Sequence, residues 1–138
     1  MFKKIVLITV CICFLSTIGI AQTNKQVEVF DCTNQTVIAK HSLQPYIEEA
    51  AISYAKSITG VFKNLSAIPK DGYIIKVPLS SQIQIQNRWI HTHIDEVVIL
   101  LPKHEPPYIM IYDDENSPHF YYVKGNPKAL LKKLHINK

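Results

Sequence analysis

The chain has 138 residues, enough for one domain of ordinary size, and carries 15 basic against 11 acidic side chains, a formal net charge of +4. Hydrophobic residues make up 47% of the sequence, which is typical of a folded protein and excludes an intrinsically disordered chain. The net charge is too small to favour nucleic acid as a partner.

The first segment in chain order, residues 1–21, has the layout of a secretory signal peptide. Two lysines precede an apolar run at residues 5–18, and small residues stand at Gly19 and Ala21. The junction that continues into Gln22 resembles signals of Gram-negative bacteria in which Gln follows the cut. The apolar run is shorter than the roughly 20 residues that a spanning helix needs. We therefore predict cleavage after Ala21, export to the periplasm or medium, and no transmembrane span in the mature chain.

The mature chain, residues 22–138, is predicted to be a single domain. Cys32 is the only cysteine that remains in it, so no internal disulfide can form and the core must hold the domain together. Cys32 lies at a predicted strand end with no base nearby in the sequence, which favours a small buried residue, or one half of an intermolecular disulfide, over a nucleophile. Residues 124–138 contain five lysines and no acid. This basic end fits weak contact with an anionic surface, or an ordinary solvated helix.

The N-terminal part of the domain reads as a hairpin followed by a helix. Residues 27–32 and 37–40 have strand composition and are separated by a turn. The helix is predicted over residues 43–58, with Ser42 as its N-cap and Gly60 closing it. Its apolar residues recur at three- and four-residue spacing and form one stripe: Leu43, Tyr46, Ile47, Ala50, Ala51, Tyr54 and Ile58.

The middle of the chain is dominated by strands. Residues 61–69 fit either a continued helix or an irregular segment, and the pattern does not decide between them. Residues 73–77 read as a strand stopped by a proline, and residues 82–86 as a separate alternating strand. Residues 89–101 alternate at first and then become wholly apolar, which predicts two strands with a turn or bulge at residues 95–96.

The last third predicts a further hairpin and a short helix. Strands are predicted at residues 108–112 and 120–123 around a turn at residues 113–118, and a short C-terminal helix begins at Asn126. The predicted fold class is therefore α+β: one amphipathic helix packed on a mostly antiparallel sheet of five to seven strands. This element order resembles cystatin-like and NTF2-like rolls.

One set of residues is a candidate for metal binding. His91, His93 and Asp95 point to one side of an extended chain, with the two imidazoles about 6 to 7 Å apart along it. Zinc is the metal that such ligands favour, and it needs three or four of them. The alternative is that these polar side chains simply face solvent, in which case the protein needs no cofactor.

A second set of residues indicates protein binding. Tyr108, Met110 and Tyr112 share one face of their predicted strand, and Tyr121 is predicted to lie near them across the hairpin. Tyrosine and methionine are enriched at protein interfaces, although packing against a helix explains the same residues.

Three functions are consistent with these patterns. The first is a small exported protein of the bacterial envelope that binds another protein without catalysing a reaction, such as an inhibitor or an immunity protein. The second is a metal-dependent hydrolase centred on His91, His93 and Asp95. The third is a small-molecule carrier with a pocket between helix and sheet, under Tyr46 and Tyr54. The sequence favours the first, a non-enzymatic role with another protein as the partner.

Overall fold

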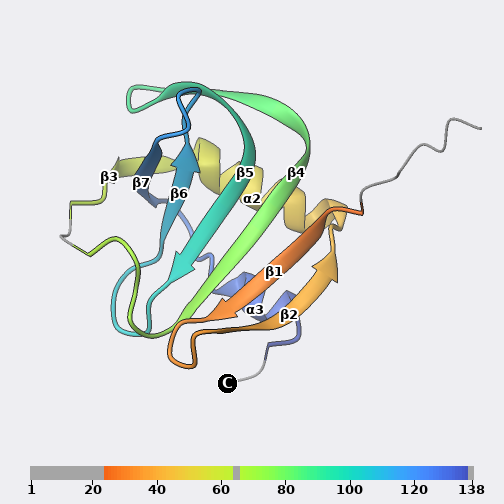
Figure 1. Cartoon of the computed structure of the whole chain (residues 1–138). Coiled ribbons are helices and arrows are strands. Elements are labelled where there is room, and N and C mark those ends of the chain that lie inside the picture. Colours follow the sequence, from red (N-terminus) through yellow and green to blue (C-terminus); the bar gives the residue numbers. More distant parts are fainter. Residues whose placement is uncertain (1–23, 64–65, 137–138) are drawn as a thin grey trace, which may run out of the picture.

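The computed structural model describes residues 24–63 and 66–136, so the predicted signal peptide at residues 1–21 lies outside the described residues (Figure 1). Within them the chain has the predicted α+β fold, with seven strands and two short helices. The finer likeness to a cystatin-like or NTF2-like roll stays a prediction. The elements in chain order are β1 (Gln26–Asp31), β2 (Thr36–Ser42), α2 (Pro45–Lys56), β3 (Ile58–Val61), β4 (Tyr73–Gln86), β5 (His91–Leu101), β6 (Tyr108–Tyr112), β7 (Pro118–Val123) and α3 (Ala129–Lys133).

The strands form one sheet in the order β2-β1-β4-β5-β6-β7-β3, and each neighbouring pair is antiparallel. The edge strands β2 and β3 are joined through α2, which lies behind the sheet in Figure 1 and contacts β4, β5 and β6. We call the sheet face that α2 covers the inner face, and the opposite face, which is turned toward the viewer, the outer face. No helix in the described part of the chain is long and apolar enough to span a membrane.

The main hydrophobic core lies between the inner face and the two helices. Ile47, Ala51 and Ala55 of α2 are fully buried there, together with alternate residues of the strands, Leu130 and Leu131 of α3, and Leu134 at its C-cap. The buried side of the helix is therefore rotated relative to the predicted apolar stripe. Tyr46, which was predicted to lie in the stripe, is 45% exposed, and Ala55 is buried instead. The side chains buried with α2 on the inner face include Val27, Val29, Ile75, Val77, Ile85, Ile94, Val97, Ile99, Leu101, Ile109 and Ile111.

The helix is shorter at both ends than its apolar repeat predicts. It begins at Pro45, whose fixed backbone angle suits the first turn, and its N-cap is Gln44 rather than Ser42. It ends at Lys56, because the Ser57 backbone N–H bonds to the carbonyl of Tyr54 and the chain then enters β3. Gly60 belongs to that strand and does not close the helix.

The central hairpin is longer and more continuous than predicted. β4 runs through Pro78, and β5 runs through Asp95 and Glu96. The predictions of two strands within residues 73–86 and of two strands within residues 89–101 were therefore wrong. Pro78 is tolerated because the pairing of β1 with β4 ends before it, at Lys76, and no strand on that side needs its missing N–H. The pairing of β4 with β5 does shift register beside Asp95, where a turn or bulge was predicted. The extra, unpaired residues of this bulge belong to β4, between Pro78 and Ile83.

Both edges of the sheet carry features that discourage further strand pairing. β2 shifts register where Val37 pairs with Phe30, and Lys40 projects from the same strand. β3 has only four residues and shifts register between Ile58 and Gly60. Bulges, lysines and short length are the usual protection of edge strands. A partner is therefore more easily accommodated on a face of the sheet than on its edges.

Candidate functional site

Two rows of side chains cross the outer face perpendicular to the strands, as the strand register requires. The first row is apolar along its whole length and consists of Val37, Phe30, Ile74, Leu100, Tyr108 and Tyr122. The second row is charged on three strands and apolar on the next three, in the order Lys40, Glu28, Lys76, Val98, Met110 and Phe120. This face thus carries more apolar side chains than a fully solvated sheet face normally does.

One end of the outer face is covered by the chain itself. Phe62 stacks on Tyr108, with ring centroids 3.9 Å apart and an angle of 14° between the planes. The Tyr108 hydroxyl donates a hydrogen bond to the carbonyl of Ala67 at 2.5 Å, and the side chain is only 1% exposed. Phe62, Val98, Leu100 and Tyr108 form a second, smaller core.

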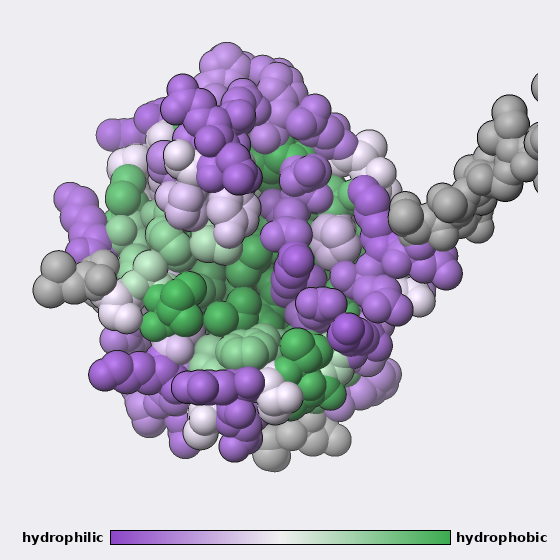
Figure 2. Space-filling model, viewed as in Figure 1, coloured by the Kyte–Doolittle hydropathy of each residue, from purple (hydrophilic) through white to green (hydrophobic). Residues whose placement is uncertain are grey.

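The other end of the outer face is open. Figure 2 shows an apolar, hollowed area near the middle of this face with hydrophilic residues around it. A hollow of about 340 Å³ is lined there by Glu28, Phe30, Val37, Ile74, Lys76, Glu96, Val98, Met110 and Tyr112. Val37 and Tyr112, at its two ends on β2 and β6, are 44% and 38% exposed. Large apolar side chains exposed beside an apolar hollow are typical of binding surfaces.

The charges around this hollow are paired with one another. Lys40 lies 3.6 Å from Glu28, and Lys76 lies 3.7 Å from Glu96. Burial raises the pKa of Glu96, while the ammonium of Lys76 acts in the opposite direction. The lining thus contains Glu28, Glu96 and Lys76, and Lys40, which lies outside the lining, pairs with Glu28.

The predicted binding residues lie on two different faces. Tyr108, Met110 and Tyr112 alternate along β6 onto the outer face, with Tyr108 buried, Met110 half-buried and Tyr112 exposed. Tyr121 does not join them, because it pairs with Ile109 and is buried in the inner core. Tyr122, opposite Tyr108, takes the place that was predicted for Tyr121. Whether these residues bind a partner stays a prediction.

The predicted metal ligands share one exposed face of β5 but have separate partners. The amide nitrogen of Gln84 lies 2.7 Å from Nε2 of His91. Nδ1 of His93 lies 3.8 Å from the carboxylate of Asp114, whose Oδ1 also accepts a hydrogen bond from the His93 backbone N–H. Across residues 24–63 and 66–136, no group of three or more His, Cys, Asp or Glu side chains could hold a metal ion. Zinc at His91, His93 and Asp95 gains no support from this arrangement.

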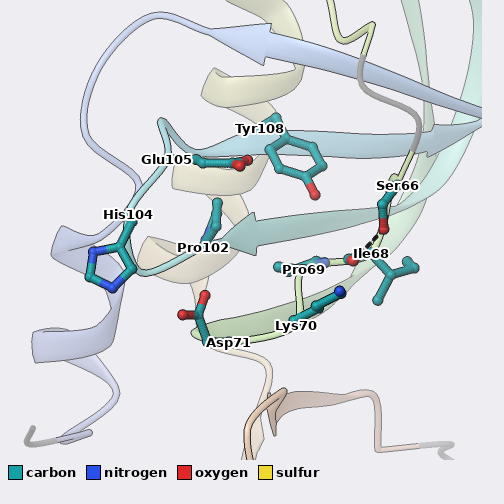
Figure 3. A pocket seen from close by; sticks show the side chains of 9 residues that line it. All are labelled: Ser66, Ile68, Pro69, Lys70, Asp71, Pro102, His104, Glu105 and Tyr108. Carbon is teal, nitrogen blue, oxygen red and sulfur yellow. Dashed lines mark hydrogen bonds between the residues drawn. The ribbon is translucent and has the colours of Figure 1, made fainter.

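A second hollow, of about 300 Å³, lies where the segment after β3 meets the loop between β5 and β6. Figure 3 shows His104 at one end of it and Ser66 and Ile68 at the other, with Tyr108 above. Its charged side chains are mixed in sign, so they do not select a ligand of one charge. They are Lys70, Asp71 and Glu105, and His104 also lines the hollow.

Cys32 and the buried side of α2 are two further features that bear on the sequence predictions. Cys32 is free and buried, and its backbone N–H bonds to the carbonyl of Gly72. Burial, followed by the charges of Asp31 and Asp71, raises the pKa of its thiol, which disfavours the nucleophilic thiolate. The carrier interpretation needs a cavity under Tyr46, but that side chain is exposed, and fully buried residues of α2 fill the space toward the sheet.

Burial of Tyr108 predicts a loss of stability at high pH. Desolvation, helped by the charge of Glu105, raises the pKa of Tyr108 to about 12 from 10.0. The folded protein holds this proton more tightly than the unfolded chain, so its contribution is complete below pH 10 and is lost as the pH rises toward 12. We expect urea unfolding to show a fall of about 2 to 3 kcal/mol from this group across that interval. Tyr108→Phe should show a shallower fall, and an equal fall in both proteins would contradict the assignment.

Comparisons with known proteins assign no family to this chain. No family model matches the chain, and no match is found among the curated proteins or the solved structures.

Proposed function

We propose that this protein is an exported, non-catalytic binding module of the bacterial envelope, of the inhibitor or immunity-protein type. In this proposal it holds another protein against the open end of its outer face. The observation that carries the proposal is the apolar hollow between Val37 and Tyr112, two exposed side chains at the end of the outer face that lies away from the covering Phe62. Such a face loses unfavourable contact with water when a partner covers it.

The composition of the hollow fits protein rather than a small polar ligand. Phe30, Met110 and Tyr112 belong to the residue types that are enriched at protein interfaces. Its charges already satisfy one another in pairs, so a partner can approach without leaving an unpaired charge buried. Lys76 and Glu96 must stay paired when the face is covered, because the Glu96 carboxylate is partly desolvated already.

Tyr112→Ala tests the proposal, with Tyr46→Ala as its matched control. Both tyrosines are exposed, but Tyr46 lies on α2, away from the outer face. Immobilised wild-type protein and the Tyr46→Ala variant are expected to retain the same protein from a bacterial envelope extract. Tyr112→Ala should weaken that binding about 10-fold or more, since buried tyrosines contribute strongly to interfaces. Equal retention of that protein by both variants would place the binding site elsewhere.

A further inference from the structure

The segment that follows β7 packs alongside α2 and turns its lysines outward. Leu130, Leu131 and Leu134 are at most 8% exposed and belong to the main core. The lysines before and between these leucines are all exposed. We call these four residues the basic strip: Lys124, Lys128, Lys132 and Lys133.

The basic strip follows the length of α2. Near its beginning the Tyr54 hydroxyl donates a hydrogen bond to the carbonyl of Asn126, and at its end the Lys133 ammonium lies 5.8 Å from the centre of the Tyr46 ring. Tyr46 and Tyr54 are separated by two turns of helix and more, or about 12 Å. The positive charges are therefore spread over an extended surface and do not converge on one point.

In the part of the chain that the structure describes, no carboxylate is paired with the basic strip. The sequence contains no acidic residue after Glu115, and the ion pairs that lysines form lie on the outer face. The carboxylates of α2 are directed elsewhere. Glu48 accepts hydrogen bonds from the backbone N–H and the hydroxyl of Ser80 at 2.6 Å, and Glu49 lines a separate hollow with Lys56. The basic strip thus offers its full charge to a partner.

We propose that the basic strip docks this protein on an anionic lipid surface. Clusters of about four to eight basic side chains on an amphipathic segment are typical of binding to acidic lipids. Lysine carries a compact charge on a flexible stem, so it needs no fixed arrangement of phosphate groups. Tyr46, which is 45% exposed beside Lys133, adds a side chain of the type enriched where membrane meets water.

A protein partner fits the basic strip less well than a lipid surface does. The leucines of this segment point into the core, so a protein would meet lysines and little apolar area to bury. Lysine is depleted at protein interfaces, whose centres are apolar. The docking surface is also separate from the proposed protein-binding surface, because α3 lies behind the sheet in Figure 1, as α2 does. A molecule docked through the basic strip keeps its outer face available to a protein.

Co-sedimentation with lipid vesicles tests the proposal. Wild-type protein should bind vesicles of phosphatidylcholine with about 30% phosphatidylglycerol, and should not bind vesicles of phosphatidylcholine alone. Raising the salt concentration from about 0.05 M to about 0.5 M should release most of the bound protein. The triple variant Lys128→Gln/Lys132→Gln/Lys133→Gln should bind at least about 30-fold more weakly. It keeps the buried leucines, so its urea unfolding should match that of the wild type.

A matched control removes the same charge elsewhere, in the triple variant Lys63→Gln/Lys70→Gln/Lys103→Gln. These three lysines are exposed and lie in the connections between β3 and β4 and between β5 and β6. The control should bind within about 3-fold of the wild type, because charges distant from the lipid are screened. Residues 1–21 are the same in every protein compared, so they cannot cause a difference. Equal weakening of the two triple variants would overturn the proposal, as would a wild type that ignores anionic vesicles.

Soluble anions separate a lipid surface from other sources of phosphate. Inorganic phosphate and polyphosphate, added at matched ionic strength, should leave the protein on the vesicles. Displacement by either one would make the basic strip a site for soluble anions and would contradict docking on lipid.

The rate at which each lysine is acetylated gives an independent readout with the wild-type protein alone. On anionic vesicles the lysines of the basic strip should react more slowly than in solution, while Lys63, Lys70 and Lys103 should react as before. Protection of Lys40 and Lys76 instead would show that the outer face lies on the lipid, and the proposal would fail. Loss of protein capture through Tyr112 with docking intact would remove the proposed function and leave this one standing.

Discussion

Replacing Ile99 with alanine is expected to lower the free energy of unfolding by about 2 to 5 kcal/mol. Ile99 is fully buried at the centre of the sheet, where it pairs with Ile75 of β4 and Ile109 of β6 and points into the inner core. The loss combines the lost burial of its methyl and methylene groups with the cost of the cavity that remains. Because a domain of this size has about 5 to 15 kcal/mol of net stability, the change would consume much of it.

Urea unfolding measures this loss, and Ile38→Ala is the matched control. Ile38 belongs to the edge strand β2 and is 43% exposed, so its truncation should cost less than about 1 kcal/mol. The dependence of the unfolding free energy on urea concentration should stay unchanged in both variants. Similar losses for the two isoleucines would show that the inner core is not centred on β5.

Gly72→Ala is expected to be at least as damaging, at about 3 kcal/mol or more, for a different reason. Gly72 precedes β4 with a φ of +93°, a conformation that residues with a side chain rarely adopt. A Cβ atom there would lie 2.1 Å from the carbonyl oxygen of Leu101, which is backbone and cannot rotate away. The Gly72 carbonyl also accepts the hydrogen bond from Cys32, so displacement of this residue would disturb the end of β1 as well.

Gly60→Ala provides the comparison for this second variant. A Cβ at Gly60 would meet nothing within 4 Å, and its φ is not in the positive range. Its unfolding temperature should therefore stay close to that of the wild type, while that of Gly72→Ala should fall by several degrees or more. If the two glycine variants unfolded at the same temperature, the close approach of Gly72 to Leu101 would not be a constraint on the fold.

Local patterns in the sequence were sufficient to predict the fold class. Alternation placed His91 and His93 on one side of the strand, and the structure exposes both, while the side chains of the apolar run at residues 97–101 are all buried. The errors occurred where a tertiary contact decides the outcome. Pro78 ends an isolated strand by its own chemistry, but here the pairing of β1 with β4 has already ended at Lys76, so β4 continues.

The candidate site was only partly predictable, because it is assembled across five strands. The sequence of β6 alone places Tyr108, Met110 and Tyr112 on one face, since they alternate along a single strand. The face of Tyr121 depends on the register of the β6–β7 hairpin, and no pattern within β7 fixes that register. Phe30 and Val98 were missed because their proximity to Met110 follows from strand order, which local patterns do not determine.

The path of α2 between the two edges of the sheet has a consequence for the order in which the molecule assembles. The β4–β5 hairpin pairs Gln86 with His91 across a short turn, whereas β3 must pair Gly60 with Tyr122. Closing a long stretch of chain costs more entropy than closing a short one, and local contacts form sooner. We therefore expect the hairpins to form early and β3 to join β7 late, so that the helix is drawn across a sheet that already exists.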